Sequence, residues 1–278
     1  MVPDFVAGTP YGTAFILFVA VSAFCWVMSL LTGEFSWVDR LWSLIPPAYC
    51  LIVAADLDFR SARVNIMTAL VLMWGVRLTA NFAVKGGYQP GGEDYRWAYM
   101  RSNLSKQQFQ LLNVTFICPG QMIIIWLFTS PIHQAWLFSG RAIGWLDYLA
   151  IVAFLVFLAG ESVADAQMLR FQKNKQRLRD AGLEVEKPYI DSGLFRFSRH
   201  PNYFCEMGMW VAFYLFAISS SNQVVHWTGL GFLLLIALFQ GSIRLTEEIS
   251  SGKYPGYSDY QATVPRVVPI PLRKLVGR

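Results

Sequence analysis

Residues 11–33 read YGTAFILFVAVSAFCWVMSLLTG and contain no charged side chain. About 20 consecutive apolar residues are enough for an α-helix to cross the hydrocarbon core of a bilayer. This segment therefore predicts a membrane-spanning helix. Because residues 1–10 contain no basic residue, we expect the helix to be retained rather than cleaved as a signal peptide.

Six further apolar segments of similar length follow along the chain. The composition agrees with lipid as the solvent, because the chain is 55% hydrophobic and 15% charged, whereas soluble domains carry about 25% charged residues. We predict an all-α fold, a polytopic membrane bundle of about seven transmembrane helices that forms a single membrane domain over residues 1–278. The predicted spans are residues 11–33, 38–56, 64–84, 110–131, 143–167, 201–220 and 224–243.

Two of the predicted spans contain residues that interrupt helices. Pro46-Pro47 lies in the second span, and Pro119-Gly120 lies in the fourth. Proline lacks the amide hydrogen that continues the helical ladder, and its ring clashes with the preceding turn. Such interruptions are tolerated in membranes when neighbouring helices satisfy the freed carbonyls. We expect both spans to be kinked or broken.

The basic residues predict the orientation in the membrane. Seven spans place the termini on opposite sides, and 19 of the 23 Lys and Arg then fall on the side of the C-terminus. The positive-inside rule makes that side cytoplasmic. We expect a multi-pass integral membrane protein with a cytoplasmic C-terminus, in the endoplasmic reticulum of a eukaryote or the inner membrane of a bacterium. The sequence does not predict an oligomeric state.

Several functional classes have no support in the sequence. The net charge of +5 follows the topology, and no basic run carries the interleaved aromatic residues of a single-strand nucleic-acid binder. No GxGxxG or P-loop motif is present. No metal site is predicted either, because the cysteines form no CxxC pair and lie in apolar stretches, where we expect buried thiols. The cysteines are Cys25, Cys50, Cys118 and Cys205.

Ionisable residues within the predicted spans indicate where function lies. Such residues are costly in a membrane and commonly mark a substrate or cofactor site. All of them fall in the predicted cytoplasmic half of their spans. We therefore expect one polar cavity that opens to the cytoplasm. The alternative is a set of interfacial charges that reach water along the membrane surface. The residues are Asp39, Arg40, Arg77, Glu161, Asp165, Glu206 and Arg244.

The most informative stretch is SGLFRFSRHPNYFCE, residues 192–206. Pro201 suits the first position of a helix, and the start of a helix offers free amides and a positive dipole end that bind anions such as phosphate. Arg196 and Arg199 lie beside this start.

The predicted helix that begins at Pro201 also carries a polar face. Asn202, Glu206 and Trp210 follow at four-residue spacing, which places an amide, a carboxylate and an indole on one side. This face could hold a ribose, a nicotinamide carboxamide or an adenine. A polar seam between helices without a ligand is the alternative.

The end of the fifth span carries a second polar group of residues. Glu161 and Asp165 are one turn apart on one face, and Gln167, Arg170 and Lys173 follow at the membrane surface. These residues are consistent with part of the same site. A helix-capping and interfacial cluster is the alternative.

The tail after the last span is rich in tyrosine. Residues 253–260 read KYPGYSDY. We expect this tail to fold back over the cytoplasmic end of the bundle, with a solvated tail as the alternative.

Three stretches together resemble the C-terminal half of steroid 5-alpha-reductase-like proteins. They are residues 164–175 (ADAQMLRFQKNK), residues 192–206, and the tail sequence KYPGYSDYQATVPRVVPIP. The resemblance is closer to the subgroup that carries a domain of unknown function numbered 1295. It covers residues 143–271, and more weakly residues 36–101.

The resemblance implies an NADPH-dependent reductase. Residues 143–271 would form the cofactor-binding half, and residues 11–131 would form the substrate-side spans. The implied reaction is hydride transfer to a carbon–carbon double bond conjugated to a carbonyl, in a steroid-like or other lipid substrate. The cofactor-binding residues that it implies are Asp165, Gln167, Arg170, Lys173, Tyr189, Arg199, His200, Asn202, Tyr203, Glu206, Trp210, Arg244 and Tyr260.

The catalytic residues carry over less completely. The resembled family holds the substrate carbonyl with a glutamate and a tyrosine in the N-terminal half. Asp39 falls at the place of the glutamate, and Trp74 falls at the place of the tyrosine. Because an indole cannot donate a proton as a phenol can, either another residue is the acid or the substrate is different. Tyr95 is our candidate, with Tyr88 as a second, so the predicted catalytic residues are Asp39 and Tyr95.

Two other functions fit parts of the same pattern. Membrane methyltransferases of the isoprenylcysteine carboxyl methyltransferase type use S-adenosylmethionine and carry an Arg-His-Pro-x-Tyr helix and paired glutamates. Asn202, Glu206 and the ADAQ segment favour the reductase. The second is a non-catalytic lipid-binding membrane protein with a degenerate site.

Overall fold

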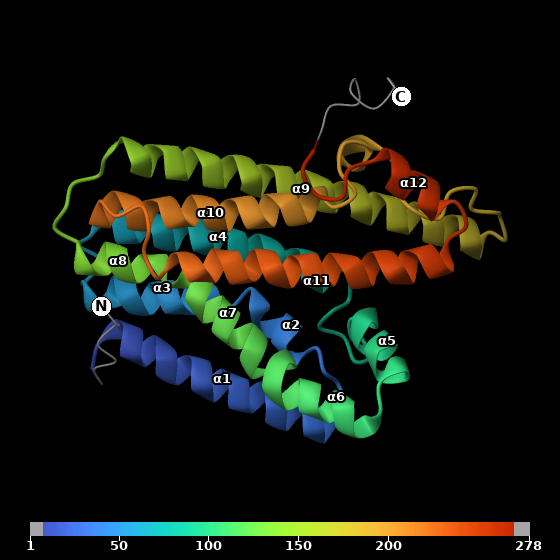
Figure 1. The fold of residues 1–278 in the computed structure, drawn as a ribbon, viewed down its shortest axis with the longest axis horizontal. Coiled ribbons are helices and arrows are strands. Elements are labelled where there is room, and N and C mark those ends of the chain that lie inside the picture. Colours follow the sequence, from blue (N-terminus) through green and yellow to red (C-terminus); the bar gives the residue numbers. More distant parts are fainter. Residues whose placement is uncertain (1–7, 270–278) are drawn as a thin grey trace. The chain divides into compact units, whose positions relative to one another are not determined.

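The computed structural model describes residues 8–269, and every regular element in this range is a helix (Figure 1). Seven of its helical segments are long and apolar enough to cross a membrane. The all-α fold with about seven spans is thus confirmed. The segments are Pro10–Thr32, Trp37–Asp56, Ala62–Val84, Lys106–Leu137, Trp145–Asp180, Pro201–Ser221 and Gly229–Lys253.

Within the described residues, the chain divides into two compact units. The first comprises residues 8–152 and 210–235, and the second comprises residues 153–209 and 236–269. Three long helices run through both units, namely α9 (Trp145–Asp180), α10 (Pro201–Ser221) and α11 (Gly229–Lys253).

The first unit begins with the uncharged span. Helix α1 (Pro10–Thr32) starts where the Thr9 hydroxyl accepts a hydrogen bond from the Gly12 amide at 3.1 Å. It ends at Gly33, whose left-handed backbone (φ 70°) closes the helix.

The second span is broken, as the sequence predicts. Helices α2 (Trp37–Trp42) and α3 (Ile45–Asp56) are separated by residues 43 and 44, and Pro46 lies in the first turn of α3. Helix α4 (Ala62–Val84) packs closely on this break, because a Cβ atom at Gly75 would lie 2.6 Å from the Ser43 carbonyl oxygen. The small residue lets the two backbones approach.

The fourth span is interrupted as well. Helix α6 (Lys106–Leu112) continues into a π-helical segment, η1 (Asn113–Ile117), and Pro119 then begins α7 (Pro119–Thr129). The short helix α8 (Pro131–Leu137) follows. A separate helix, α5 (Tyr95–Asn103), precedes this span. The prediction of a kinked or broken fourth span is therefore confirmed.

Aromatic packing and one buried ion pair hold the first unit together. The Trp74 and Trp210 rings meet edge to face at 5.1 Å, and the Phe128 ring lies 4.0 Å from Trp210. The buried Arg63 guanidinium donates to the Asp147 carboxylate at 2.8 Å. A buried pair of this kind is costly to break, because the remaining charge is left without a partner.

The second unit contains most of α9, the start of α10 and the end of α11. It also contains a short 3-10 helix, η2 (Gly193–Arg196), and helix α12 (Tyr257–Thr263). Helices α9 and α10 lie in close contact, because a Cβ atom at Gly160 would lie 2.8 Å from Cys205 Sγ. All four cysteines are free and buried, as expected.

The predicted bounds of two spans differ from the observed helices. The fifth helix continues to Asp180 rather than ending at residue 167, because the polar residues beyond the apolar run are good helix formers. The seventh helix begins at Gly229 rather than at residue 224 and continues to Lys253. Residues 222–228 form a connection, where the Tyr214 hydroxyl bonds the Val224 carbonyl at 3.0 Å. Apolar composition alone did not distinguish this loop from a helix.

Candidate functional site

Arg199 organises the start of helix α10. Its side chain is buried, and Nε and Nη2 donate to the two carboxylate oxygens of Glu247 at 2.7 and 3.2 Å. Nη1 donates to the carbonyls of Gln261 and Val264, and the Arg199 amide donates to Pro265 at 2.9 Å. A guanidinium has five N–H donors. Arg199 therefore ties α10 to α11 and the tail, and little of it remains for a ligand.

Glu247 is the centre of this network and is absent from the predicted site. The His200 Nε2 atom lies 3.1 Å from Glu247 Oε1. Glu247 Oε2 accepts from the Gln261 side chain at 3.2 Å, and Arg266 lies 3.5 Å away. Sequence inspection finds the pair Glu247-Glu248 but does not show which of them faces inward. Cationic and amide donors satisfy this buried carboxylate.

The tyrosine-rich tail folds back onto the segment that leads into α10. The Tyr260 hydroxyl donates to the Phe195 carbonyl at 2.6 Å, and Tyr189 donates to the Gly256 carbonyl at 2.9 Å. Ser198 bonds Val267 at 2.6 Å. Burial raises the pKa of Tyr260 above its ordinary value, so this phenol remains a donor at neutral pH. Residues 254–267 are thus a packed part of the fold rather than a solvated tail.

A buried lysine, also absent from the predicted site, fixes the other end of the tail. Lys175 Nζ donates to the Pro188 carbonyl at 2.6 Å and to the Tyr254 hydroxyl at 3.0 Å. It also lies 4.4 Å from the centre of the Tyr254 ring, a cation–π contact. Burial acts to raise the pKa of Tyr254, but the bond and charge of Lys175 hold that pKa below its ordinary value.

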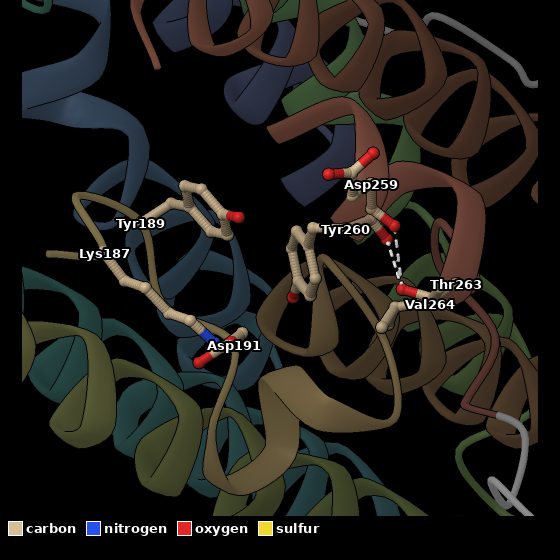
Figure 2. A pocket seen from close by; sticks show the side chains of 7 residues that line it. All are labelled: Lys187, Tyr189, Asp191, Asp259, Tyr260, Thr263 and Val264. Carbon is tan, nitrogen blue, oxygen red and sulfur yellow. Dashed lines mark hydrogen bonds and ion pairs between the residues drawn. The ribbon is translucent and has the colours of Figure 1, made fainter. Parts of the chain in front are cut away.

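A pocket of about 260 Å³ opens where the tail meets the loop after α9 (Figure 2). The Tyr189 and Tyr260 rings stack there at 5.5 Å, and Lys187 pairs with Asp191 at 2.7 Å. Two carboxylates against one ammonium group disfavour a phosphate in this pocket, whereas the stacked rings offer an aromatic surface. The lining residues are Lys187, Tyr189, Asp191, Asp259, Tyr260, Thr263 and Val264.

Five predicted cofactor residues have polar side-chain groups that form no hydrogen bond or ion pair within residues 8–269. Asn202 and Tyr203 are half-buried in the first turn of α10, and the Tyr203 ring stacks on Phe239 at 4.9 Å. The others are exposed. Side-chain groups without a bonding partner are accessible to a ligand. The five residues are Arg170, Lys173, Asn202, Tyr203 and Arg244.

The contacts between helices in the second unit place several predicted residues at the same height along the helix axes. Gly160 meets Cys205, and Phe157 meets Gly208, so α9 and α10 are antiparallel in this unit. This register places Asp165 of α9 level with residue 200. The ring contact of Tyr203 with Phe239 and the contact of His200 with Glu247 place the intervening stretch of α11, which carries Arg244, at that level too.

Two predicted acids lie inside the second unit. Asp165 is 7% exposed and Glu206 is 4% exposed, as expected for carboxylates held in contact with other groups. Within residues 8–269, no group of three or more His, Cys, Asp or Glu could hold a metal ion. Gln167 has a structural contact, because its Oε1 atom accepts from the Leu194 amide at 2.9 Å.

Trp210 is the one predicted cofactor residue that the structure assigns to the first unit. It belongs to the first unit, where it is fully buried against Trp74 and Phe128. Trp74, which stands at the place of the family's tyrosine, is fully buried in the same cluster. Both indoles therefore pack the core of the first unit.

The two predicted catalytic residues come from neighbouring segments of the first unit. Asp39 Oδ2 accepts from the Trp97 indole at 2.8 Å. Tyr95, the first residue of α5, precedes that indole by two positions and is 54% exposed. The Arg40 guanidinium pairs with Glu34 at 2.6 Å and donates to the Gly87 carbonyl at 3.1 Å, and among residues 8–269 it forms no ion pair with Asp39.

Hydrogen bonds and an ion pair connect the loops around Asp39. The Gly91 amide donates to Glu34 at 3.1 Å, and the Asp94 amide donates to the Ser36 hydroxyl at 2.9 Å. The Gly91 amide and the Arg40 guanidinium hold the pKa of Glu34 below its ordinary value. These contacts fix the position of α5, and with it Tyr95, relative to α2.

The fold is that of a polytopic helical membrane protein, and its C-terminal half carries a cluster of buried polar and charged residues. The chain belongs to the family described as protein of unknown function DUF1295, whose model matches residues 25–264. This confirms the subgroup predicted from the motifs. The chain is 34% identical over 281 residues to uncharacterized protein C594.04c of Schizosaccharomyces pombe, with 96% of this chain and 82% of the relative covered. No solved structure matches the chain.

Proposed function

We propose that this protein is an integral membrane reductase that uses NADPH to reduce a carbon–carbon double bond conjugated to a carbonyl in a lipophilic substrate. One observation carries the proposal. The Arg199–Glu247 network holds α10 and α11 so that Asn202, Tyr203 and Arg244 have no bonding partner among the described residues. The resemblance of the surrounding motifs to steroid 5-alpha-reductases supports this chemistry.

The residues present fit NADPH. Arg170, Lys173 and Arg244 supply accessible cations for its phosphates. Asn202 supplies an amide that can bond a carboxamide or a ribose hydroxyl. It lies in the first turn of a 21-residue helix, where free amides also favour anions. The aromatic pocket beside Tyr189 and Tyr260 suits an uncharged planar group better than a phosphate.

Under this proposal, NADPH would supply a hydride, and the chain would supply orientation and a proton. The Trp97 indole donates to the Asp39 carboxylate and fixes its orientation. In this scheme Asp39 in turn orients a hydrogen-bond donor toward the substrate carbonyl. Such a donor stabilises the negative charge that develops on that oxygen. Tyr95 Oη is the proposed proton donor to the alpha carbon. The apolar helices of the first unit would hold the lipid frame.

The test is cofactor binding by the purified protein. We expect NADPH, but not S-adenosylmethionine, to raise the unfolding temperature, because a ligand of the folded state stabilises it. Asn202→Ala should weaken NADPH binding about 3- to 10-fold, the value of one hydrogen bond. Asn174→Ala is the matched control, because Asn174 is an exposed amide of α9 whose side chain, among residues 8–269, bonds Arg177 alone.

The outcomes separate the candidate functions. Stabilisation by S-adenosylmethionine alone would identify a methyltransferase, and no response to either compound would leave a lipid-binding protein. If NADPH binds, incubation with a panel of lipophilic enones should add two hydrogen atoms to one of them, as read by mass spectrometry. Asp39→Ala should stop that reaction while NADPH binding persists.

A further inference from the structure

Tyr49 is a buried phenol in the middle of helix α3. Its side chain is 2% exposed, and its hydroxyl makes no hydrogen bond to any of residues 8–269. A hydroxyl buried without a hydrogen bond costs free energy, which folded proteins normally avoid. The hydroxyl of Tyr49 therefore calls for a partner.

Neighbouring hydroxyls in the first unit show how this cost is usually met. Ser22 and Thr68 each donate to the carbonyl one turn earlier in the same helix, at 2.8 Å. A short side chain can reach that carbonyl. The phenol oxygen lies at the far end of a rigid ring and needs a partner on another segment. Tyr214 has one in the Val224 carbonyl at 3.0 Å.

Tyr49 differs from other buried polar atoms of the first unit that have no partner among the described residues. Ser61 and Asn65 lie at the start of α4, beside a loop. His133 lies in α8, one turn before Trp136, whose indole bonds Asp56 at the end of α3. Tyr49, in contrast, lies well inside a predicted membrane span, where bulk water does not reach.

The surroundings of Tyr49 define the chemistry of its partner. Ile45 and Val53, one turn away on either side, are buried on the same face of α3. Thr68 of α4 directs its single hydroxyl proton to the carbonyls of Val64 and Cys50, so it has no proton to give to Tyr49. The partner must therefore be largely apolar and must offer an oxygen that accepts a hydrogen bond.

The oxygen must also be uncharged. An ionised group in this region would be buried without a counter-charge. The buried cation Arg63, at the start of α4, is already paired with Asp147 at 2.8 Å. A carbonyl or hydroxyl oxygen of a lipophilic molecule meets all of these conditions.

We propose that Tyr49 Oη donates a hydrogen bond to a carbonyl or hydroxyl oxygen of the lipophilic substrate and selects substrates by that oxygen. The inference rests on the proposed function for the identity of the ligand as substrate. A site built to bond an oxygen discriminates strongly against analogues that lack it, because its own donor is then left unpaired. Tyr49 is thus a specificity-determining residue.

The first test is heat stability without a ligand, with Tyr49→Phe compared with Tyr214→Phe in the same detergent. Removing an unpaired buried hydroxyl should leave the unfolding temperature of Tyr49→Phe equal to or above that of the parent. Tyr214→Phe loses a hydrogen bond and should unfold at a lower temperature. A decrease in Tyr49→Phe as large as that in Tyr214→Phe overturns the proposal, because the hydroxyl would then have a partner in the free protein.

The second test measures binding of progesterone, a flat lipid with a carbonyl at each end, and of two analogues that each lack one carbonyl. The parent should bind one analogue about 3- to 10-fold more weakly than progesterone. Tyr49→Phe should lose that preference. Full retention of the preference overturns the proposal. NADPH should stabilise the parent and Tyr49→Phe equally, and a parent that ignores NADPH contradicts only the proposed function.

Discussion

At the scale of single residues, the charged side chains of the C-terminal half divide into two roles. Arg199 and Glu247 are buried and bond each other and the tail, so they position the start of α10. Arg170, Lys173 and Arg244 are exposed and bond none of the described residues. Mutations in the first group should lower the free energy of unfolding. Mutations in the second group should weaken binding of the proposed ligand.

The Arg199–Glu247 pair should therefore be a major contributor to stability. Glu247→Ala leaves the Arg199 guanidinium buried without its counter-charge, and we expect a loss of about 3 kcal/mol in the free energy of unfolding. Denaturant unfolding in detergent measures this loss. Glu248→Ala is the matched control, because Glu248 is the exposed neighbour. Equal losses in both variants would show that Glu247 is not the centre of the network.

At the scale of helices, small residues set how closely segments approach. The helix break before Pro46 lies against Gly75, and α9 meets α10 at Gly160. In lipid, apolar side chains gain little free energy by contacting each other, because the lipid tails are equally apolar. Close packing of helix backbones is therefore a main source of helix association there. The α9–α10 contact would matter for the proposed function, because it sets the positions of Asp165 and Asn202 along the two helices.

A glycine-to-alanine substitution should have opposite effects on stability at Gly160 and at Gly241. At Gly160 a Cβ atom would lie 2.8 Å from Cys205 Sγ, whereas at Gly241 nothing lies within 4 Å. Gly160→Ala should lower the free energy of unfolding by about 1–3 kcal/mol through overpacking. Gly241→Ala should be neutral or stabilising, because alanine favours the helix.

Restored stability in the double variant Gly160→Ala, Cys205→Ala would show that the sulfur causes the loss. If Gly160→Ala is as stable as the parent, α9 and α10 do not pack in the register described. Thermal unfolding of the purified variants in one detergent is the measurement.

At the scale of the whole molecule, the distribution of basic residues predicts the orientation. Seven spans place 19 of the 23 Lys and Arg on the side of the C-terminus. Orientation follows such an excess because basic loops are retained in the cytoplasm. The proposed NADPH site has its accessible cations on the predicted cytoplasmic side.

A reporter fused after Arg278 should accordingly be cytoplasmic, and one inserted at Asp4 should lie on the opposite side. A reporter that is active only in the cytoplasm, compared with one active only outside it, measures both positions. The reporter inserted at Asp4 serves as the internal control for the one after Arg278. Two cytoplasmic termini would mean an even number of spans and would contradict the seven-span topology.

The sequence alone determined the class of this protein and most of its spans. Long uncharged segments and interrupting prolines act through the local chemistry of the chain, and both broken spans occur where prolines predict them. Motif spacing also identified the family, because residues 164–206 and the tail keep their pattern whatever the surrounding structure. The sequence did not locate the polar end of α9, because a charged run is compatible with either a helix or a loop.

Only the tertiary structure decided which polar residues face each other. Arg199 and Glu247 are 48 residues apart, and Lys175 and Tyr254 are 79 residues apart. Tyr49 shows the same limit, because nothing in its neighbours along the chain reveals that its hydroxyl has no hydrogen-bond partner among the described residues. Periodicity shows which face of a helix a residue occupies, but pairing depends on the contacts between helices. The roles of these residues follow from packing, whereas the membrane fold follows from composition.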